Sequence, residues 1–186
     1  LRVPFGTRHD YMGPHNHRLQ LGDNVYLEII AVDPAGTKPD RARWFGLDNP
    51  GTIRSDWEAG RRLRGWVAST DDLRAVVAAN QSVFGEAVAL PFAAPEFLFS
   101  IPADGSLPLD GAAPSLIDHQ GNPTRMAEIP DMGARLHNFE IAHPDAQMII
   151  DFLHGMGIDR PPNVLSGART RLTAQINTRD GLKTLT

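Results

Sequence analysis

The clearest pattern of polar and apolar positions lies between residues 15 and 32. In residues 15–21, histidines and leucines occupy the odd positions and polar residues the even ones, which is typical of a half-buried strand. Residues 25–32 are apolar on both faces apart from Glu28. Since Gly22-Asp23-Asn24 can form a turn between the two segments, we predict a β-hairpin that brings His15 or His17 onto the face of Glu28.

Two later segments each combine a strand with a helix. Residues 63–69 read as a strand, and apolar residues then recur at helical spacing until Gly85. Residues 137–143 read as a second strand, before a helix that Gly157 ends. Residues 33–62 have no sustained period and predict one long connection. Further strands are predicted at residues 86–92, 96–101, 115–119, 171–177 and 182–185.

These elements predict an α+β fold in one compact domain with three parts. Residues 1–62 would hold the hairpin and the long connection, and residues 63–135 the first strand–helix unit with its following strands. Residues 136–186 would add the second strand–helix unit and the closing strands. The share of Gly and Pro, 32 of 186 residues, fits strands joined by many turns better than a helical bundle.

Composition and charge exclude several classes of function. The chain has no cysteine, which excludes disulfides, thiol nucleophiles and Cys-ligated metals and makes the cytoplasm the expected compartment. No apolar run approaches the length that spans a bilayer, so no membrane partner is expected. The net charge is −4 and the arginines are dispersed, apart from Arg61-Arg62-Leu63-Arg64, which we expect to be a solvated strand approach. Nucleic acid is therefore not an expected partner.

Glu28 is the most informative candidate for chemistry. A carboxylate within an apolar strand needs a cavity, a cation or a hydrogen-bond partner, because an unpaired buried charge costs several kcal/mol. Together with His15 or His17 it could bind Zn²⁺, Fe²⁺, Mn²⁺, Ni²⁺ or Co²⁺. Alternatively, Glu28 pairs with an arginine and the histidines donate to backbone carbonyls.

Three other residues remain open candidates. His119 follows an apolar run and could supply a base or a ligand, or simply lie in a turn. Trp44 and Phe45 form an aromatic pair within the long polar connection, and either pack it down or line a ligand pocket. No nucleophile elbow, phosphate loop or dinucleotide fingerprint is present, so serine hydrolysis and nucleotide chemistry have no support.

Several short runs together resemble the glyoxalase-like domain proteins of the vicinal oxygen chelate superfamily. They occur in the right order over most of the chain: Met12 to Asn16, Leu21 to Ala31, Asp33-Pro34, Arg43 to Leu47, Trp66, Thr70 to Leu73, Pro114 to Asp118, His143 to Asp145 and Leu172 to Asn177.

The resemblance implies paired βαβββ modules whose curved mixed sheets enclose a shared cleft. It implies a divalent metal there, with Glu28 and His15 as ligands or acid–base groups. Tyr26, Trp44, Phe45, Trp66 and His119 would line the substrate pocket. The superfamily's first strand and helix would precede Val3, so we expect them to be missing from the chain as given.

Two functions follow from the resemblance. The first is a metal-dependent lyase, isomerase or dioxygenase that acts on a small oxygenated molecule. The alternative is a protein of the same fold that binds and sequesters a small molecule without catalysis. A homodimer is compatible with both.

Overall fold

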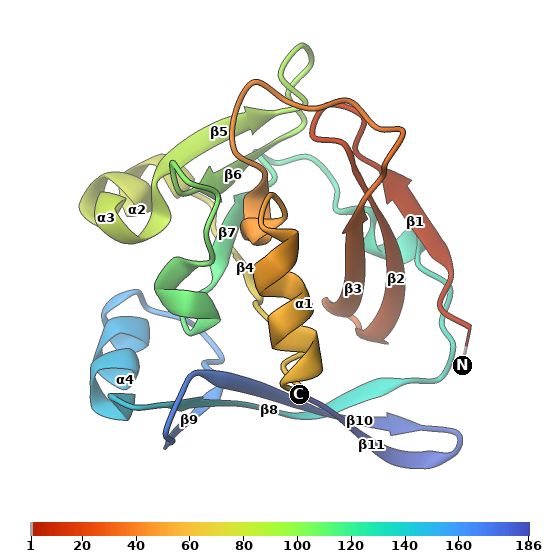
Figure 1. The fold of residues 1–186 in the computed structure, drawn as a ribbon, viewed down its shortest axis with the longest axis vertical. Helices are drawn as coiled ribbons and strands as arrows, with labels where there is room; N and C mark the ends of the chain where they lie inside the picture. Colours follow the sequence, from red (N-terminus) through yellow and green to blue (C-terminus); the bar gives the residue numbers. More distant parts are fainter. Residues whose placement is uncertain (1) are drawn as a thin grey trace.

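Three sheets organise the chain, and the computed structural model describes residues 2–186 (Figure 1). The first sheet has the order β1-β2-β3 and contains β1 (Phe5–Arg8), β2 (Pro14–Gly22) and β3 (Val25–Val32). The α+β class and the curved mixed sheets of the predicted fold are confirmed. The strands predicted from the sequence pattern are also present, with ends that differ by a few residues.

The second sheet has the order β4-β7-β6-β5, in which β4 pairs parallel with β7. Its strands are β4 (Val67–Ser69), β5 (Glu86–Leu90), β6 (Phe97–Ile101) and β7 (Ser115–Asp118). Two short helices, α2 (Leu73–Ala79) and α3 (Gln81–Phe84), pack on one face through Leu73, Val77 and Phe84. The segment from β4 to β7 is thus a βαβββ unit whose helical part is divided at Asn80.

The third sheet has the order β11-β10-β8-β9. It contains β8 (Arg135–His143), β9 (Asn163–Ser166), β10 (Arg171–Thr178) and β11 (Gly181–Leu185), and α4 (Ala146–Gly155) buries Ile149 and Leu153 against it. Here the strand after the helix, β9, pairs parallel with β8 directly. In the second sheet, by contrast, the strand that pairs parallel with β4 is β7, the last strand of the unit.

The acids that follow β4 and β8 begin the helices. The side chain of Asp72 accepts from the backbone N–H of Ala75 at 3.1 Å, and that of Asp145 accepts from Met148 at 3.1 Å. Each acid therefore caps a helix by satisfying one of the free N–H groups of its first turn.

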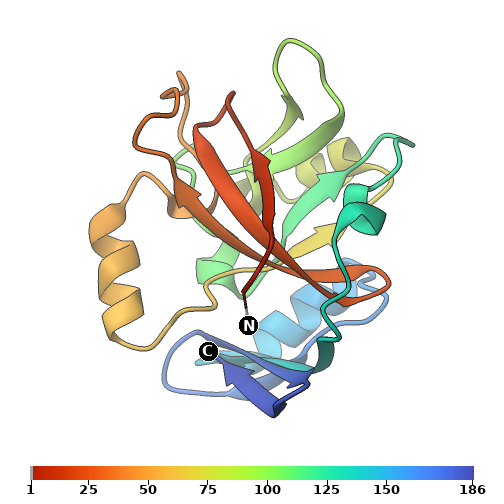
Figure 2. The same cartoon turned by 90° about the vertical axis from the view of Figure 1, so that its right-hand side faces the viewer.

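The long connection predicted over residues 33–62 is wrong in one respect, because it contains helix α1 (Pro50–Glu58). Asn49 caps this helix and Pro50 occupies its first position, yet none of its residues is buried. In Figure 2 the helix stands at the side of the molecule, apart from the sheets. A helix without an apolar stripe leaves no helical period to detect, which is why the pattern misses it.

The three sheets share apolar contacts. Met12 and Trp44 pack with Phe99 and Ile101 between the first and second sheets. Leu19 and Leu21 of β2 pack with Ala174 and Ile176 of β10, which joins the first sheet to the third. Among residues 2–186, no helix has the length and apolar character needed to cross a membrane.

Candidate functional site

A cavity of about 340 Å³ lies between the first and second sheets. One wall comes from β1, the turn after it, β2 and β3, and the other from β4, β6 and β7 with the following segment. Its volume is within the range of small-molecule sites in proteins. The first wall carries most of the polar groups, and the second contributes apolar side chains such as Phe97, Phe99 and Ile117.

Glu28 of β3 lies in the first wall and is held by Asn16 of β2. Its Oε1 accepts a hydrogen bond from the Asn16 side-chain amide. The orientation of that amide is fixed because its oxygen accepts from the backbone N–H of Thr7 at 2.7 Å. Burial raises the pKa of the Glu28 carboxyl, while Asn16 and the charge of Arg18 oppose that shift. Glu28 is therefore a half-buried residue whose carboxyl group holds its proton to a higher pH than an exposed glutamate.

Asn16 also binds His9, which lies in the turn after β1. The amide nitrogen of Asn16 is 3.2 Å from His9 Nε2, and His9 Nδ1 is 3.0 Å from the hydroxyl of Tyr11. Since the amide donates, Nε2 accepts and Nδ1 carries the proton. Burial, followed by the charge of Arg18, lowers the pKa of His9 to about 4, so the imidazole is neutral at pH 7.

Arg18 stands opposite Glu28 on the neighbouring strand. Its side chain lies across Gly6 of β1, where an added Cβ would come within 2.8 Å of Arg18 Nε and 2.2 Å of Asn16 Oδ1. Glycine at this position leaves the space that both cavity side chains occupy. The Nε atom is buried and has no hydrogen-bond partner within residues 2–186.

Aromatic side chains also line the cavity, next to the polar residues just described. Trp44 is 4% exposed, and its ring packs edge-on against His9 at 5.3 Å and Phe99 at 5.3 Å between ring centres. The indole nitrogen of Trp44 finds no hydrogen-bond partner in the described part of the chain. Tyr26 lines the same wall and is 38% exposed; partial burial of its phenol, followed by the charge of Glu28, raises its pKa to about 12. Tyr26 is therefore a neutral hydrogen-bond donor at pH 7.

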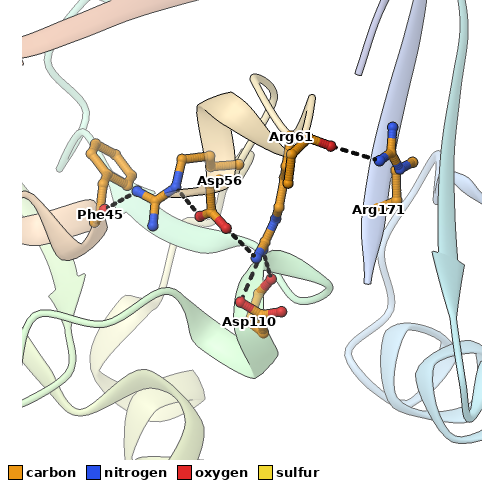
Figure 3. A network of polar contacts seen from close by, with 7 residues as sticks. Phe45, Asp56, Arg61, Asp110 and Arg171 are labelled. Atoms are coloured by element: carbon orange, nitrogen blue, oxygen red, sulfur yellow. Dashed lines mark hydrogen bonds and ion pairs between the residues drawn. The ribbon is translucent and has the colours of Figure 1, made fainter. Parts of the chain in front are cut away.

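Phe45 is held at the cavity by a network of charged side chains (Figure 3). Its backbone has a φ of 60°, and its carbonyl accepts from Arg64 Nη1 at 3.1 Å. Arg64 Nε in turn donates to Asp56 of α1 at 2.7 Å. The other Asp56 oxygen lies 3.7 Å from Arg61, which also pairs with Asp110 at 2.9 Å. Helix α1 thereby contributes to the position of the Phe45 backbone.

This network corrects the expectation for the arginine cluster at residues 61–64. The side chains of Arg61 and Arg64 are only 13% and 18% exposed and are paired with acids, so the cluster is not simply a solvated approach to a strand. Arg62 lies over the Trp57 ring, with its guanidinium carbon 4.9 Å from the ring centre.

Five of the predicted site residues line the cavity: Glu28, Tyr26, Trp44, Phe45 and His119. His15 does not join them. It pairs with Ala31, and His17 pairs with Ile29, whereas Glu28 shares its face with Arg18 and Asn16. The predicted approach of His15 or His17 to Glu28 is therefore wrong, because the hairpin register places the two histidines on the opposite face.

Trp66 also lies away from the cavity, contrary to the expected role in substrate binding. Its ring packs edge-on against Phe139 of β8 at 5.8 Å, and its indole nitrogen donates to the Ala112 carbonyl at 3.4 Å. The next residue, Val67, lines the cavity instead. Successive residues of an extended segment point to opposite sides, so only one of the two can face the ligand.

The donor set at Glu28 does not fit the divalent metal that the resemblance implies. Within residues 2–186, no group of three or more histidine, aspartate or glutamate side chains is placed to hold a metal ion. The neighbours of Glu28 are the amide of Asn16 and the cation Arg18, and His9 directs its Nε2 toward Asn16. An amide N–H donor and a guanidinium do not ligate a cation, so no step is assigned to a metal here.

Among the cavity residues that the sequence did not predict are three polar neighbours of Glu28. His9 lies in a turn with no periodic pattern, while Asn16 and Arg18 occupy the even positions of β2 that looked like its solvent face. The sequence pattern held no signal for Asn16 and Arg18, because which residues share the face of Glu28 depends on the register of the hairpin.

Comparisons with known proteins identify a family. The model of the glyoxalase-like domain family, which is part of the vicinal oxygen chelate superfamily, matches residues 1–156. A segment of the carbamoyl phosphate synthase large chain of Renibacterium salmoninarum is 29% identical over 125 residues. This match covers 64% of the present chain but only 11% of that protein. No solved structure gives a significant match.

Proposed function

Because the chain belongs to the glyoxalase-like domain family, we propose that it binds a small oxygenated molecule in the cavity and uses Glu28 to transfer a proton. The observation that carries this proposal is the placement of Glu28, whose half-buried carboxyl group, with a raised pKa, lies in the wall of the cavity. A carboxyl group whose pKa is moved toward the working pH is suited to general acid–base catalysis.

The proposed step is removal of a proton from a carbon next to a carbonyl group. The ionised Glu28 takes the proton, the electron pair of the C–H bond forms the C=C bond of an enolate, and the carbonyl oxygen becomes negatively charged. Return of the proton to a different atom gives an isomer, and loss of a leaving group gives a lyase product. Asn16 holds one oxygen of Glu28 and thereby orients the carboxylate toward the ligand.

Hydrogen exchange provides a direct test of this step. The protein is incubated in D₂O with a panel of small hydroxyketones, aldehydes and 2-oxo acids, and loss of the signal of the proton next to the carbonyl is followed by NMR. We expect Glu28→Gln to slow catalysed exchange by about 10²- to 10⁴-fold, the usual contribution of a positioned acid–base group. Exchange at the same rate in Glu28→Gln would contradict the proposal.

Folding of the variant is a built-in control. Burial makes ionisation of Glu28 unfavourable, so the stability associated with this group is present at low pH and is lost as the pH rises through its elevated pKa. The neutral amide of Glu28→Gln avoids this loss. We therefore expect its melting temperature at pH 7 to be at least that of the wild type, so that lost activity does not reflect unfolding.

Binding without catalysis is the second candidate, and the aromatic lining by Trp44, Phe45, Phe97 and Phe99 favours it. It predicts that a panel compound binds with the same affinity in the wild type and in Glu28→Gln, with no exchange above the buffer rate. Elemental analysis of the wild type and of Glu28→Gln distinguishes both of these functions from that of a metal-dependent enzyme. Stoichiometric metal that is lost in Glu28→Gln would support metal dependence.

A further inference from the structure

Three arginines line the cavity, and two of them are engaged with acids. Arg8 is paired with Asp33, and Arg125 Nη2 lies 3.3 Å from Glu96 Oε2. Arg18 takes part in none of the ion pairs formed among residues 2–186. It differs from the other two because it forms no ion pair with a carboxylate of the described chain, although Glu28 lies opposite it across the hairpin.

The position of Arg18 limits what its guanidinium can reach. The Nε atom is buried beside Gly6 and lacks a partner, so the terminal amino groups are the part that can contact a ligand in the cavity. Arg18 stands opposite Glu28 across the hairpin and lines the cavity together with Glu28 and His9. A half-buried cation without a partner is costly unless an anion completes it.

We propose that Arg18 binds an oxyanion of the ligand, so that the cavity selects small organic carboxylates with an apolar or aromatic body. A guanidinium matches the geometry of a carboxylate through two parallel N–H donors. The opposite wall of Phe97, Phe99 and Ile117 accepts the apolar body. This assignment rests on the proposed use of the cavity for a small molecule, and it deepens that function by naming the ligand class.

The neighbourhood of Glu28 fits this assignment. Three arginines and two glutamates line the cavity, so the charges of its lining favour an anion even when both glutamates are ionised. The same guanidinium is also placed to hold the enolate oxygen that proton removal by Glu28 would create. A carboxylate and a developing enolate are both oxyanions, and one planar cation suits either.

The test uses two probes of nearly the same shape, benzoate and benzamide, which differ in charge. Their affinities are measured by calorimetry with the wild type, Arg18→Gln and Arg18→Lys, and with Arg54→Gln as a matched loss of charge on the exposed side of α1. We expect the wild type to bind benzoate about 10- to 100-fold more tightly than benzamide, as for other charge-assisted hydrogen bonds. Arg18→Gln should remove this preference, Arg18→Lys should retain part of it, and Arg54→Gln should leave it unchanged.

Several results would overturn the assignment. The wild type could bind the two probes with equal affinity, or the preference for benzoate could survive in Arg18→Gln. The preference could also be lost in Arg125→Gln and not in Arg18→Gln. If Arg18→Gln does not fold, the comparison of the wild type with Arg18→Lys decides, and an unchanged ratio counts against the proposal. Because benzoate has no proton next to its carbonyl carbon to exchange, this test does not depend on turnover. Loss of exchange in Glu28→Gln with an unchanged probe ratio in Arg18→Gln would retain the proposed function and reject the oxyanion site.

Discussion

Asn16 connects two titratable groups without allowing a proton to pass between them. Its amide donates to Glu28 on one side and to His9 on the other, while its oxygen is occupied by the Thr7 backbone. A side-chain amide neither gains nor loses a proton at physiological pH, so Asn16 cannot relay one and Glu28 and His9 act as separate groups. Glu28 faces the ligand space as the acid–base candidate, and His9 supports the orientation of Asn16.

The low pKa of His9 predicts a specific dependence of stability on pH. Its pKa is about 4 in the folded protein against a reference value of 6.5. The unfolded chain therefore binds a proton first as the pH falls, and the stability contributed by neutral His9 is present above 6.5 and is lost between pH 6.5 and 4. The shift corresponds to about 3 kcal/mol. Urea unfolding at several pH values measures this loss.

His9→Gln is the matched variant for that measurement. Its side-chain oxygen can accept the hydrogen bond from Asn16, but it does not titrate. We expect the free energy of unfolding of His9→Gln to change less than that of the wild type between pH 6.5 and 4, by about 3 kcal/mol. Parallel pH profiles for the two proteins would mean that His9 is not the group responsible.

At the scale of elements, a single bulge decides which residues face the cavity. Gly22 pairs with Val25, but Gln20 pairs with Tyr26, so Leu21 is an extra residue on β2. Without it, the pairing that starts at the turn would place His17 or Leu19 on the face of Glu28. The shift by one residue places Arg18 and Asn16 there instead.

The sequence could therefore predict the hairpin but not its register. The alternation of residues 15–21 and the turn at Asp23-Asn24 are local signals, and both are found in the structure. The position of a bulge depends on packing beyond the hairpin, here that of Leu19 and Leu21 on the third sheet. Helix α1 was missed for a related reason, since it is held by a cap and by charges rather than by an apolar face.

The charges around α1 give a second prediction. Asp56 pairs with both Arg61 and Arg64 and is 17% exposed, so its removal leaves the largely covered Arg64 without a carboxylate and Arg61 with only the exposed Asp110. We expect Asp56→Ala to lower the free energy of unfolding by about 2 kcal/mol. Because Arg64 holds the Phe45 carbonyl, benzoate binding should weaken as well.

Asp110→Ala is the control for that prediction. Asp110 pairs with Arg61 but is 62% exposed, and exposed ion pairs contribute less than about 1 kcal/mol. Urea unfolding and calorimetry of the two variants test the difference. A loss of stability in Asp110→Ala that equals or exceeds that in Asp56→Ala would contradict the role given to α1.

At the scale of the whole molecule, the cavity depends on how the first two sheets meet. Trp44, Phe45 and His119 could be chosen from the sequence because aromatic and polar residues in connections are unusual and need a reason. Bringing His119 to Glu28 and Phe45 joins segments that lie 91 and 74 residues apart in the sequence, which no local pattern contains. The distance in sequence also explains why Trp66 was misplaced. Its own segment resembles a strand, but the choice of face is made by the third sheet.

Substitutions of Trp66 and Trp44 should therefore have different effects, the first mainly on the free energy of unfolding and the second mainly on benzoate affinity. Trp66 packs on Phe139 of β8 and against the buried cluster of the third sheet and α4, while Trp44 packs on His9 at the cavity. We expect Trp66→Ala to lower the free energy of unfolding by about 2 kcal/mol, less than for a fully buried tryptophan, and to leave benzoate affinity within about twofold.

Trp44→Phe should preserve most of the stability because it retains an aromatic ring, but it should weaken benzoate binding by removing lining surface and the free indole N–H. Urea unfolding and calorimetry on the same samples measure both quantities. A benzoate affinity that falls in Trp66→Ala and not in Trp44→Phe would place the ligand beside the third sheet instead of between the first two.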